Sequence, residues 1–297
     1  MEQIQNNRVI TDLYRENAQF PGIALDGSDV YLCWQRFVDR HDSLMASCRR
    51  GDEVVWEREI SDGGEVLHPV ILAHGGAIWY AWSEYARENW RILARCYRDG
   101  QWGEVLTVAS GEALFFPRLF TWQGKLHVIW TEQHKGSAAA VLCPLTEAGP
   151  GAAETVSAVG EAYRAGAAEG GDGNLYVAYD GFDGKQYKLF ARARTAAGWS
   201  GEIVVSQGED WASTPWIAAK PDGAVVGWYD YGYMAVYSVR SADLTVRDGA
   251  LAAVNPQCLK EGVDWYLDLH VASNSSGLQA MAYTRSKYDV LVCTRRG

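Results

Sequence analysis

A short motif recurs along the chain at nearly constant spacing, and this repeat constrains the fold more than any other feature. Each copy contains an apolar strand, a Gly-containing turn, a second apolar strand and a closing aromatic residue. The closing residues are Trp34, Trp82, Trp130, Tyr179, Trp228 and Tyr283. Their spacings of 48, 48, 49, 49 and 55 residues predict six copies of one structural unit.

Each unit is expected to hold four strands. In the second copy, "VILA" and "AIWYAW" would form an inner hairpin, followed by "WRILARCYR" and "VLTVA". Turns such as "HGG" and "RDGQ" carry the residues that tight hairpins need. The second strands are apolar nearly throughout, which is typical of strands buried on both faces, and their closing aromatics are expected to pack in the core. Four-stranded units of this length indicate β-propeller blades.

The predicted fold is therefore all-β: a single-domain, six-bladed β-propeller of four-stranded antiparallel blades. The sixth unit ends at "DVLVCTRRG" without a fourth strand, while "NNRVITDLYREN" near the N-terminus resembles the fourth-strand segment "GEVLTVASGE". Because an open ring leaves an unpaired edge, Arg8–Asp12 is predicted to complete the last blade and close the ring. The alternative is a frayed N-terminal tail. The expected blades are 20–66, 67–114, 115–161, 162–211, 212–265, and 266–297 together with 6–14.

The charge and the cysteines limit the setting of the protein. A formal net charge of −10 disfavours nucleic-acid binding, which needs a basic surface. No apolar run approaches the roughly 18 residues of a membrane span, and residues 1–20 lack the apolar stretch of a secretory signal. Equivalent third-strand positions in different blades are too far apart for disulfides, which predicts free thiols and a cytoplasmic protein. The cysteines at that position are Cys48, Cys96, Cys143 and Cys293.

Loops are predicted to begin directly after the closing aromatics, and their residues differ from copy to copy. Two places after each aromatic stand Arg36, Glu84, Glu132, Gly181, Asp230 and Arg285. The fourth copy carries its carboxylate one residue earlier, as Asp180. Further polar residues at the start of the first strands are His68, Arg164, Thr214 and Asp268. In a closed ring the last and first blades are neighbours, so Arg36 and Arg285 would be adjacent and would face a crescent of carboxylates.

This rim has a chemical interpretation. Two adjacent arginines hold a carboxylate or phosphate through bidentate hydrogen bonds. Close carboxylates drive their pKa values apart, so one donates a proton while another stays ionised, as glycoside hydrolysis requires. The candidate catalytic residues are Glu84, Glu132, Asp230 and Tyr229, and the candidate ligand-binding residues are Arg36, Arg285, Arg164, His68, Asp180 and Asp268. The alternative is that these charges are solvated or pair with one another.

The repeat "P-x-I-A-x-D-G-x-V-Y-L-x-W", followed by a third strand and "D-G-x-W", resembles the repeats of sialidase-like (BNR-type) propellers. The resemblance covers nearly the whole chain and implies a fold in which arginines, an acidic residue and a tyrosine nucleophile meet at the centre. Arg36, Arg164 and Arg285 would supply the arginines, and Tyr229 or Tyr231 the hydroxyl. The full Asp-box, S-x-D-x-G-x-x-W, is absent, and the first blade opens with Phe20 where a sialidase has an arginine.

The leading prediction is a glycoside hydrolase or lyase-like enzyme that binds an acidic sugar, or another small anion, in a central funnel. No metal or cofactor is expected, because the sequence contains no metal-ligand spacing or nucleotide-binding motif. The framework repeats while the rim does not, which favours one asymmetric site over a multivalent lectin. Glu84→Gln or Glu132→Gln would then abolish turnover and leave the melting temperature unchanged. The alternative is a non-catalytic scaffold or lectin-like module that binds a protein, peptide or sugar on one face.

Overall fold

The computed structural model describes the backbone of most of the chain. The described residues are 8–9, 17–61, 63–158, 160–232, 237–263, 269–273, 278–285 and 289–296, with backbone alone for 8–9, 260 and 262–296. This described part is all-β, as predicted, and consists of strands and turns. It contains no helix long and apolar enough to cross a membrane.

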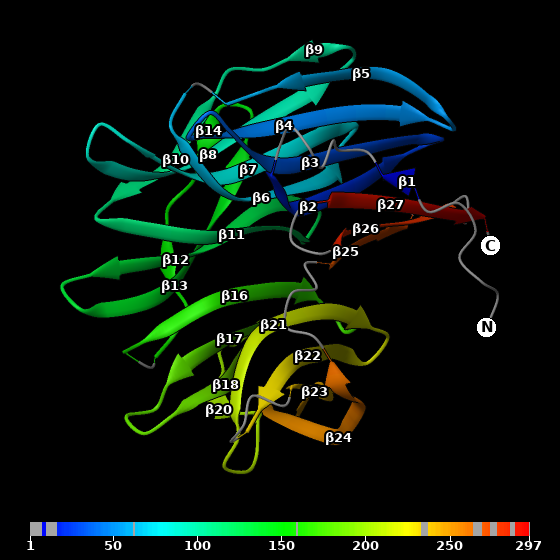
Figure 1. Cartoon of the computed structure of the whole chain (residues 1–297). Coiled ribbons are helices and arrows are strands. Elements are labelled where there is room, and N and C mark those ends of the chain that lie inside the picture. The colour runs from blue at the N-terminus through cyan, green and yellow to red at the C-terminus, as the bar shows by residue number, and fades with distance from the viewer. Residues whose placement is uncertain are drawn as a thin grey trace. The chain divides into compact units, whose positions relative to one another are not determined.

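The chain forms two compact units, residues 1–110 with 266–297 (unit 1) and residues 111–265 (unit 2). The described strands form six antiparallel sheets, three in each unit. Unit 1 contains β2 (Asn17–Asp26), β3 (Asp29–Val38), β4 (His41–Arg50) and β5 (Glu53–Glu59); β6 (Glu65–His74), β7 (Ala77–Ala86), β8 (Asn89–Arg98), β9 (Gln101–Trp102) and β10 (Leu106–Gly111); and β25 (Leu269–Ser273), β26 (Leu278–Arg285), β27 (Asp289–Arg296) and β1 (Arg8–Val9) (Figure 1).

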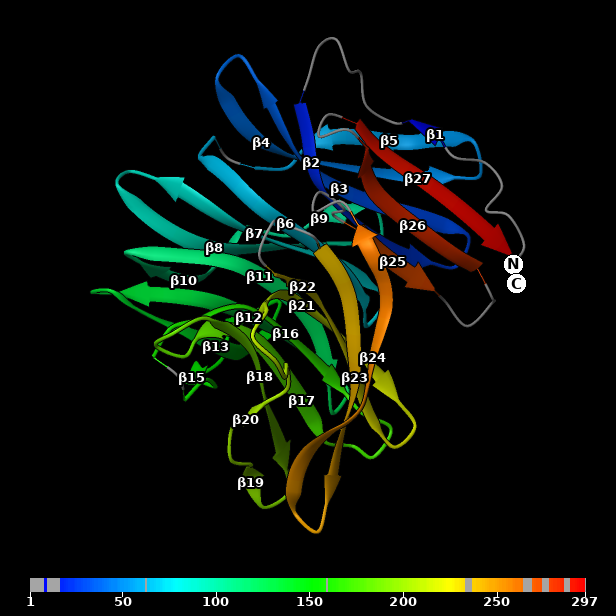
Figure 2. The same cartoon turned by 60° about the horizontal axis from the view of Figure 1, so that its bottom comes forward.

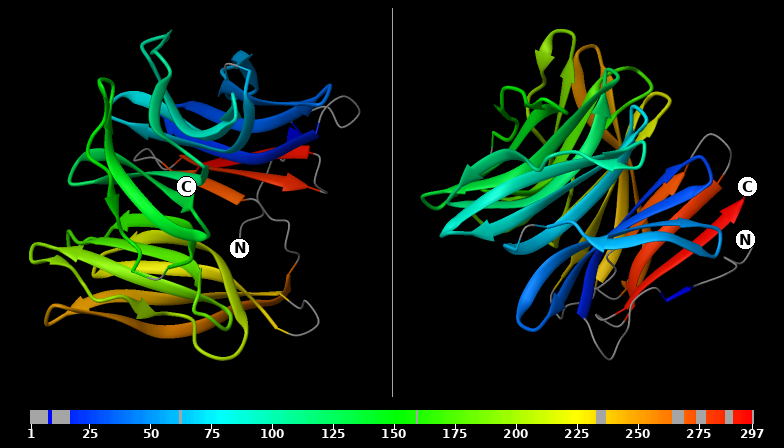
Figure 3. Two further views of the ribbon diagram at one scale, coloured as in Figure 1. Left: turned by 90° about the vertical axis from the view of Figure 1, so that its left-hand side faces the viewer. Right: turned by 90° about the horizontal axis from the view of Figure 1, so that it is seen from above.

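Unit 2 is built in the same way. Its strands are β11 (Ala113–Trp122), β12 (Lys125–His134), β13 (Ser137–Thr146), β14 (Gly149–Pro150) and β15 (Glu154–Thr155); β16 (Ala162–Glu169), β17 (Leu175–Phe182), β18 (Tyr187–Thr195), β19 (Gly198–Trp199) and β20 (Ile203–Val204); and β21 (Trp211–Lys220), β22 (Gly223–Tyr231), β23 (Tyr237–Arg247) and β24 (Ala250–Val263). Strand β21 contacts β16, β17 and β18, so the β16–β20 sheet and the β21–β24 sheet are neighbours (Figure 3). The hairpin of β23 and the long outer strand β24 forms the edge of the β21–β24 sheet (Figure 2).

The N-terminal strand β1 pairs with the last strand of the chain, β27. Arg8 lies opposite Val292, and Val9 lies opposite Leu291. The predicted pairing of the N-terminus with the sheet of β25, β26 and β27 is therefore confirmed for these two residues, while Ile10–Asp12 lie outside the described residues. The single domain and its closed ring stay predictions.

The second strand of each inner hairpin continues past its closing aromatic, so the prediction that loops begin there is wrong. Strand β3 runs four residues beyond Trp34, to Val38, and β7 runs four residues beyond Trp82, to Ala86. The ladder to the third strand remains regular and ends in a two-residue turn in which both residues have positive φ, 52° and 65° at Asp39 and Arg40. Such turns match the twist of paired strands, so the hairpin extends further than the apolar pattern does.

The closing aromatics form the repeated centre of the core. Trp34, Trp82, Trp130, Tyr179 and Trp228 are at most 3% exposed. The prediction that they pack in the core is confirmed for these five. Large aromatic side chains contribute most of the apolar area that holds each sheet against its neighbour.

The Trp of the shortened "D-G-x-W" motif, Trp102, has a structural role that Trp199 repeats in a second sheet without the motif. The guanidinium of Arg95 lies 5.2 Å from the ring centre of Trp102, and its Nε donates a hydrogen bond of 2.8 Å to the carbonyl of Gly103. Arg192 repeats the arrangement, 5.4 Å from the ring centre of Trp199, with a 3.0 Å bond to a carbonyl. An arginine of the third strand thus fixes the turn that follows it.

The five cysteines with described side chains are free thiols, as predicted. Cys33, Cys48, Cys96 and Cys143 are buried, and Cys258 is exposed. Burial raises the pKa of Cys48 and of Cys143 to about 11, so their thiolate fraction at neutral pH is very small.

We expect iodoacetamide at pH 8 to label Cys258 in the native protein at least about tenfold faster than the four buried thiols. Peptide mapping measures this, and equal labelling before unfolding would contradict the packing.

Candidate functional site

The first strand of five sheets carries a β-bulge at one equivalent position. The bulged pairs lie opposite the closing aromatics, and each pair begins with a residue whose φ is positive, between 36° and 55°. These residues are Phe20, His68, Phe116, Arg164 and Thr214. Four of them precede a proline, which has no N–H and loses no ladder bond in a bulge. Bulges redirect side chains next to functional sites, and positive φ at residues other than Gly is a sparsely populated conformation.

Bulge residues of neighbouring sheets contact one another within each unit. In unit 1, the rings of Phe20 and His68 meet edge to face with centres 4.9 Å apart. In unit 2, the guanidinium of Arg164 lies 6.0 Å from the ring centre of Phe116. The bulges therefore place side chains from successive sheets side by side, as a binding site requires.

Arg164 and Asp180 form the most deeply buried ion pair of unit 2. Arg164 Nε donates to Asp180 Oδ1 at 3.2 Å, and Nη2 donates to Oδ2. The side chain of Asp180 is fully buried, while that of Arg164 is 27% exposed. Burial raises the pKa of Asp180, and this is opposed by Arg164 and by the backbone N–H groups of Asp180 and Thr214. Burial would lower the pKa of Arg164, but the Asp180 carboxylate outweighs it and the pKa is raised.

A row of aromatic side chains borders this ion pair. Ring centres along the row are 5.3 to 6.0 Å apart, which is the separation of contacting rings. The row, in order, is Tyr163, Tyr187 with Phe182 beside it, Trp211, Tyr231 and Tyr237. Trp211 is 40% exposed, and the other rings are half-buried. The row crosses from the β16–β20 sheet to the β21–β24 sheet, and both Tyr187 and Tyr231 lie close enough to influence the pKa of Arg164.

Asp230 lies next to the aromatic row but on the other face of its strand. It is 4% exposed, and its Oδ2 is 2.5 Å from Nε of Arg240. Burial raises the pKa of Asp230, with a further contribution from Asp210, while Arg240 opposes the shift. Among the described residues, Asp230 Oδ1 accepts no hydrogen bond. Tyr229, the reserve nucleophile of the sequence prediction, is buried and packs its ring against Trp216.

Glu84 has a closed environment in unit 1. Its side chain is fully buried, with Oε1 paired to Arg91 Nη2 and Oε2 accepting a 3.2 Å hydrogen bond from the indole of Trp82. A Cβ placed on Gly64 would lie 2.4 Å from Glu84 Cγ, so the backbone covers the carboxylate. Arg91 stands directly opposite Glu84 in the ladder.

Glu132 is the equivalent residue in unit 2, and its surroundings differ. Its ladder partner is Ala139 instead of an arginine. The side chain is half-buried and forms no ion pair within the described part of the chain. Of the four predicted carboxylates that the structure describes, Glu84, Glu132, Asp180 and Asp230, it alone is not neutralised by a neighbouring arginine there.

The side-chain faces also separate these carboxylates. Successive residues of a strand point to opposite faces. Glu84, Glu132 and Asp230 therefore share the face of their closing tryptophan, whereas Asp180 follows Tyr179 directly and points to the other face. Asp180 is not a shifted copy of the glutamates, because it meets Arg164 of the first strand instead of an arginine of the third.

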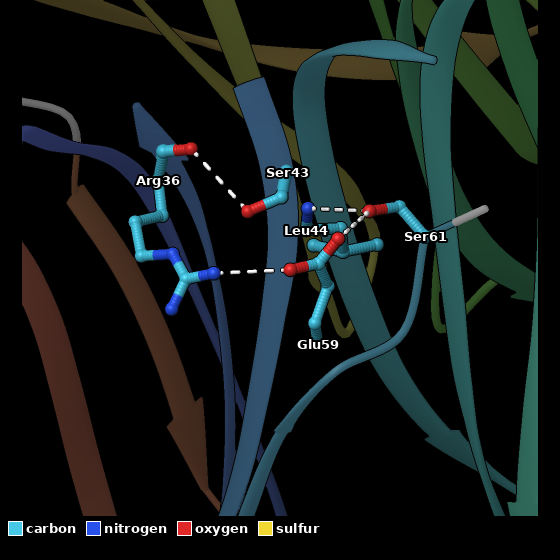
Figure 4. Close-up of polar contacts among 5 residues, drawn as sticks. All are labelled: Arg36, Ser43, Leu44, Glu59 and Ser61. Atoms are coloured by element: carbon cyan, nitrogen blue, oxygen red, sulfur yellow. Dashed lines mark hydrogen bonds and ion pairs between the residues drawn. The ribbon is translucent and has the colours of Figure 1, made fainter. Parts of the chain in front are cut away.

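Arg36 is engaged within its own sheet (Figure 4). Its Nη2 donates a 3.0 Å hydrogen bond to Glu59 Oε2, and its carbonyl accepts one from Ser43. Ser61 bonds the other oxygen of Glu59, at 3.5 Å. The side chain of Arg285 and the whole of Asp268 lie outside the described residues, so the predicted Arg36–Arg285 pair stays a prediction. Within the described part, no group of three or more His, Cys, Asp or Glu side chains could hold a metal ion.

The sequence analysis missed most of the aromatic row, although a signal for it exists. An aromatic three places after the closing residue is followed by another five or six residues later, and the two are ladder partners. The pairs are Tyr85 with Trp90, Phe182 with Tyr187, and Tyr231 with Tyr237. Trp211 and Tyr163 lie shortly before the bulges. Trp211 joins the last two pairs, and Tyr163 extends the row from Tyr187.

Comparison with known proteins identifies the fold. No family model and no curated protein matches the chain, but several solved structures share its architecture. A subtype N10 neuraminidase-like protein (A/little yellow-shouldered bat/Guatemala) matches with a TM-score of 0.56 and 9% identity, over 99% of this chain and 100% of that one. The mannose phosphorylase MPT-4 from Leishmania mexicana matches with a TM-score of 0.52 and 8% identity, over 99% and 89%.

A third match is an α-L-arabinofuranosidase from Lactobacillus brevis, with a TM-score of 0.51 and 11% identity, over 82% of this chain and 94% of that one. At these identities the likeness concerns the fold alone. The chain thus has the all-β, propeller-like architecture of glycoside hydrolases and neuraminidase-like proteins. Of the predicted resemblance, the propeller-like fold is confirmed, and the sialidase-like family is not.

The contrast between Glu84 and Glu132 changes one expectation of the sequence analysis. We expect Glu84→Gln to lower the free energy of unfolding by about 3 kcal/mol, because it removes the charge of a buried, hydrogen-bonded pair. Glu132→Gln, a matched change at a half-buried carboxylate, should stay within about 0.5 kcal/mol of wild type. Urea denaturation followed by tryptophan fluorescence measures both. Equal stability of the two variants would contradict the different environments described for them.

Proposed function

We propose that the chain is a carbohydrate-active protein whose glycan binds in unit 2, over the aromatic row and beside Arg164. The observation that carries the proposal is that the aromatic row and the side chain of Arg164 lie close together. Small-molecule sites combine apolar and aromatic walls with a few convergent polar groups. Tyr and Trp are suited to this role because each has an apolar body and a polar tip. Sugars present C–H faces and hydroxyl edges in the same pattern.

The fold supports the proposal without deciding it. Glycoside hydrolases and a mannose phosphorylase are among the structures that share the architecture, yet one fold hosts many unrelated activities. We further propose that the six sheets are the blades of one closed ring, with β1 completing the last blade. The pairing of β1 with β27 supports this closure, because it supplies the fourth strand that the last sheet otherwise lacks.

For catalysis, the proposal is hydrolysis or elimination with Glu132 as the acid/base residue. A proton-transfer group must reach the substrate and exchange protons with it. Glu132 is half-buried and has no arginine partner among the described residues, whereas Glu84, Asp180 and Asp230 are each paired with one. The other catalytic candidates from the sequence suit this role less well, because Asp230 is 4% exposed and paired with Arg240, and Tyr229 is buried against Trp216.

The alternative is a module that binds a glycan or another partner without turnover. The specific observation in its favour is that three of the four described carboxylates from the prediction are neutralised by arginines of their own sheets. The sequence also predicts an acidic ligand held by Arg36 and Arg285, and this ligand is part of the proposal of an enzyme, not of the binding module. A cytoplasmic location is proposed from the free thiols alone.

Two exposed tryptophans of one strand provide the binding test. Trp211 is 40% exposed and belongs to the aromatic row, and Trp216 of the same strand is 41% exposed but lies outside it. We expect Trp211→Ala to weaken glycan binding at least about tenfold, as loss of a central aromatic contact does, and Trp216→Ala to leave it near wild type. A glycan array followed by titration calorimetry measures this. Equal effects of the two changes, or no glycan bound at all, would refute the proposal.

Turnover separates the enzyme from the binding module. On a glycan found by the array, Glu132→Gln should lower kcat at least about a hundredfold, with little change in dissociation constant, because general acid–base catalysis contributes roughly 10²–10⁴-fold. Product formation is followed by chromatography of the sugar. If wild type binds the glycan and releases no product, the binding module is the correct alternative.

A further inference from the structure

We propose that the glycan bound over the aromatic row is uncharged, and that Arg164 recognises its hydroxyl groups instead of gripping an anion. This inference rests on the proposed function and names the substrate class of the same site. It differs from the acidic glycan expected from the sequence.

The first observation is the state of Arg164. Its Nε and Nη2 are bound to Asp180, whose carboxylate is fully buried. The pair therefore has no net charge. The guanidinium has five N–H donors in total, so the remaining ones can donate to hydroxyl oxygens, and the side chain is 27% exposed. Arg164 thus provides directional donors at the edge of the row without a free positive charge.

Two other cations near the row, the half-exposed Arg240 and the buried Lys188, also have partners. Arg240 is paired with Asp230 on the β21–β24 sheet. Lys188, which is 7% exposed, donates from Nζ to the carbonyl of Gly208. Lys188 keeps its charge, but it is nearly fully buried and lies close enough to Asp183 and Asp230 to lower the pKa of both carboxylates, which offset it.

Carboxylates predominate among the other charges around the row. Lys185 lies in the turn between Phe182 and Tyr187, where the neighbouring Asp183 offsets it, and two further carboxylates stand without a cation in the described part of the chain. Besides burial, the negative charge of Glu161 raises the pKa of Tyr163, and that of Asp210 raises the pKa of Asp230. A Cβ on Gly232, the residue after Tyr231, would lie 2.7 Å from Asp210 Oδ1, which places this carboxylate beside the row. Neither Glu161 nor Asp210 forms an ion pair with a Lys or Arg among the described residues. An anionic glycan would bring like charges together, and such juxtaposition excludes ligands effectively.

The hydroxyl groups of the row complete a site for neutral sugars. Tyr163, Tyr187, Tyr231 and Tyr237 each carry a phenol, which both donates and accepts hydrogen bonds. Burial raises the pKa of Tyr231, so its hydroxyl stays protonated at neutral pH. Since the row spans two sheets, we expect a glycan of several sugar units to occupy it.

The test uses an array of neutral oligosaccharides and of oligosaccharides bearing uronic or sialic acids. Wild type should bind neutral glycans most tightly, and this binding should be lost in Trp211→Ala. For the tightest binder, a matched derivative carrying a carboxylate should bind at least about tenfold more weakly. The affinity for the neutral glycan should change little between 50 mM and 500 mM NaCl, because screening acts on charge–charge attraction. A charged glycan as the tightest binder, with affinity falling as salt is added, would overturn the inference.

A charge variant gives a second, independent readout. Asp180→Asn leaves Arg164 as an unpaired cation, so the variant should gain at least about tenfold in affinity for the carboxylated derivative. Asp243→Asn is the matched control, since it frees Lys220, whose Nζ is 2.7 Å from Asp243 Oδ2, at the opposite end of β22 from Tyr231. This control should bind as wild type does. A carboxylated glycan bound equally well by wild type and Asp180→Asn would contradict the inference.

These outcomes separate the inference from the function on which it rests. Binding of a charged glycan that depends on Trp211 would refute the neutral class and keep the carbohydrate site. Absence of any Trp211-dependent glycan binding would refute both. The salt dependence needs only wild-type protein, so the inference remains testable if Asp180→Asn does not fold.

Discussion

The pairing of a bulged first strand with a closing aromatic is the constraint on which the rest of each sheet depends. In five sheets, two bulge residues lie opposite one buried Trp or Tyr. The aromatic fixes the inner hairpin in the core, and the bulge turns the first strand so that one side chain is directed differently from its neighbours. Because this arrangement repeats, side chains of successive sheets meet at one end of each unit, where Phe20 contacts His68 and Phe116 contacts Arg164.

Charge compensation at this end takes two forms that the strand period keeps apart. Carboxylates two residues after the closing aromatic pair with arginines of the third strand, as Glu84 does with Arg91 and Asp230 with Arg240. Asp180, one residue earlier in its copy, pairs with the bulge arginine Arg164. Placing the carboxylate one residue earlier thus changes both the strand face to which it points and the arginine with which it pairs. Both kinds of pair join strands of one sheet, but only the second leaves an arginine beside the aromatic row.

Much of the fold could be predicted from the sequence, because repeat spacing and turn residues are local signals. The closing aromatics, the free thiols and the pairing of Arg8–Val9 with the last strand follow from them. The ends of the second strands could not be read in the same way, since polar residues such as Arg36 continue a ladder that apolar patterning does not mark. The candidate site was harder still. Its residue types were visible, but Arg91 and Arg240 neutralise two of the carboxylates through cross-strand geometry, and Trp211 joins the aromatic row only because two sheets lie side by side.

The bulges also bear on how such a chain can acquire new chemistry. At five equivalent places the backbone already has the left-handed conformation, and it accepts Phe, His, Arg or Thr there. Much of the conformational cost of placing a side chain at this position is therefore borne by the framework and differs little between residue types. A single codon change at one bulge could replace an aromatic contact with a cation or a hydroxyl without insertion of a loop. Diversification of this scaffold would then proceed by exchanging residues at fixed backbone positions, and designed variants could follow the same route.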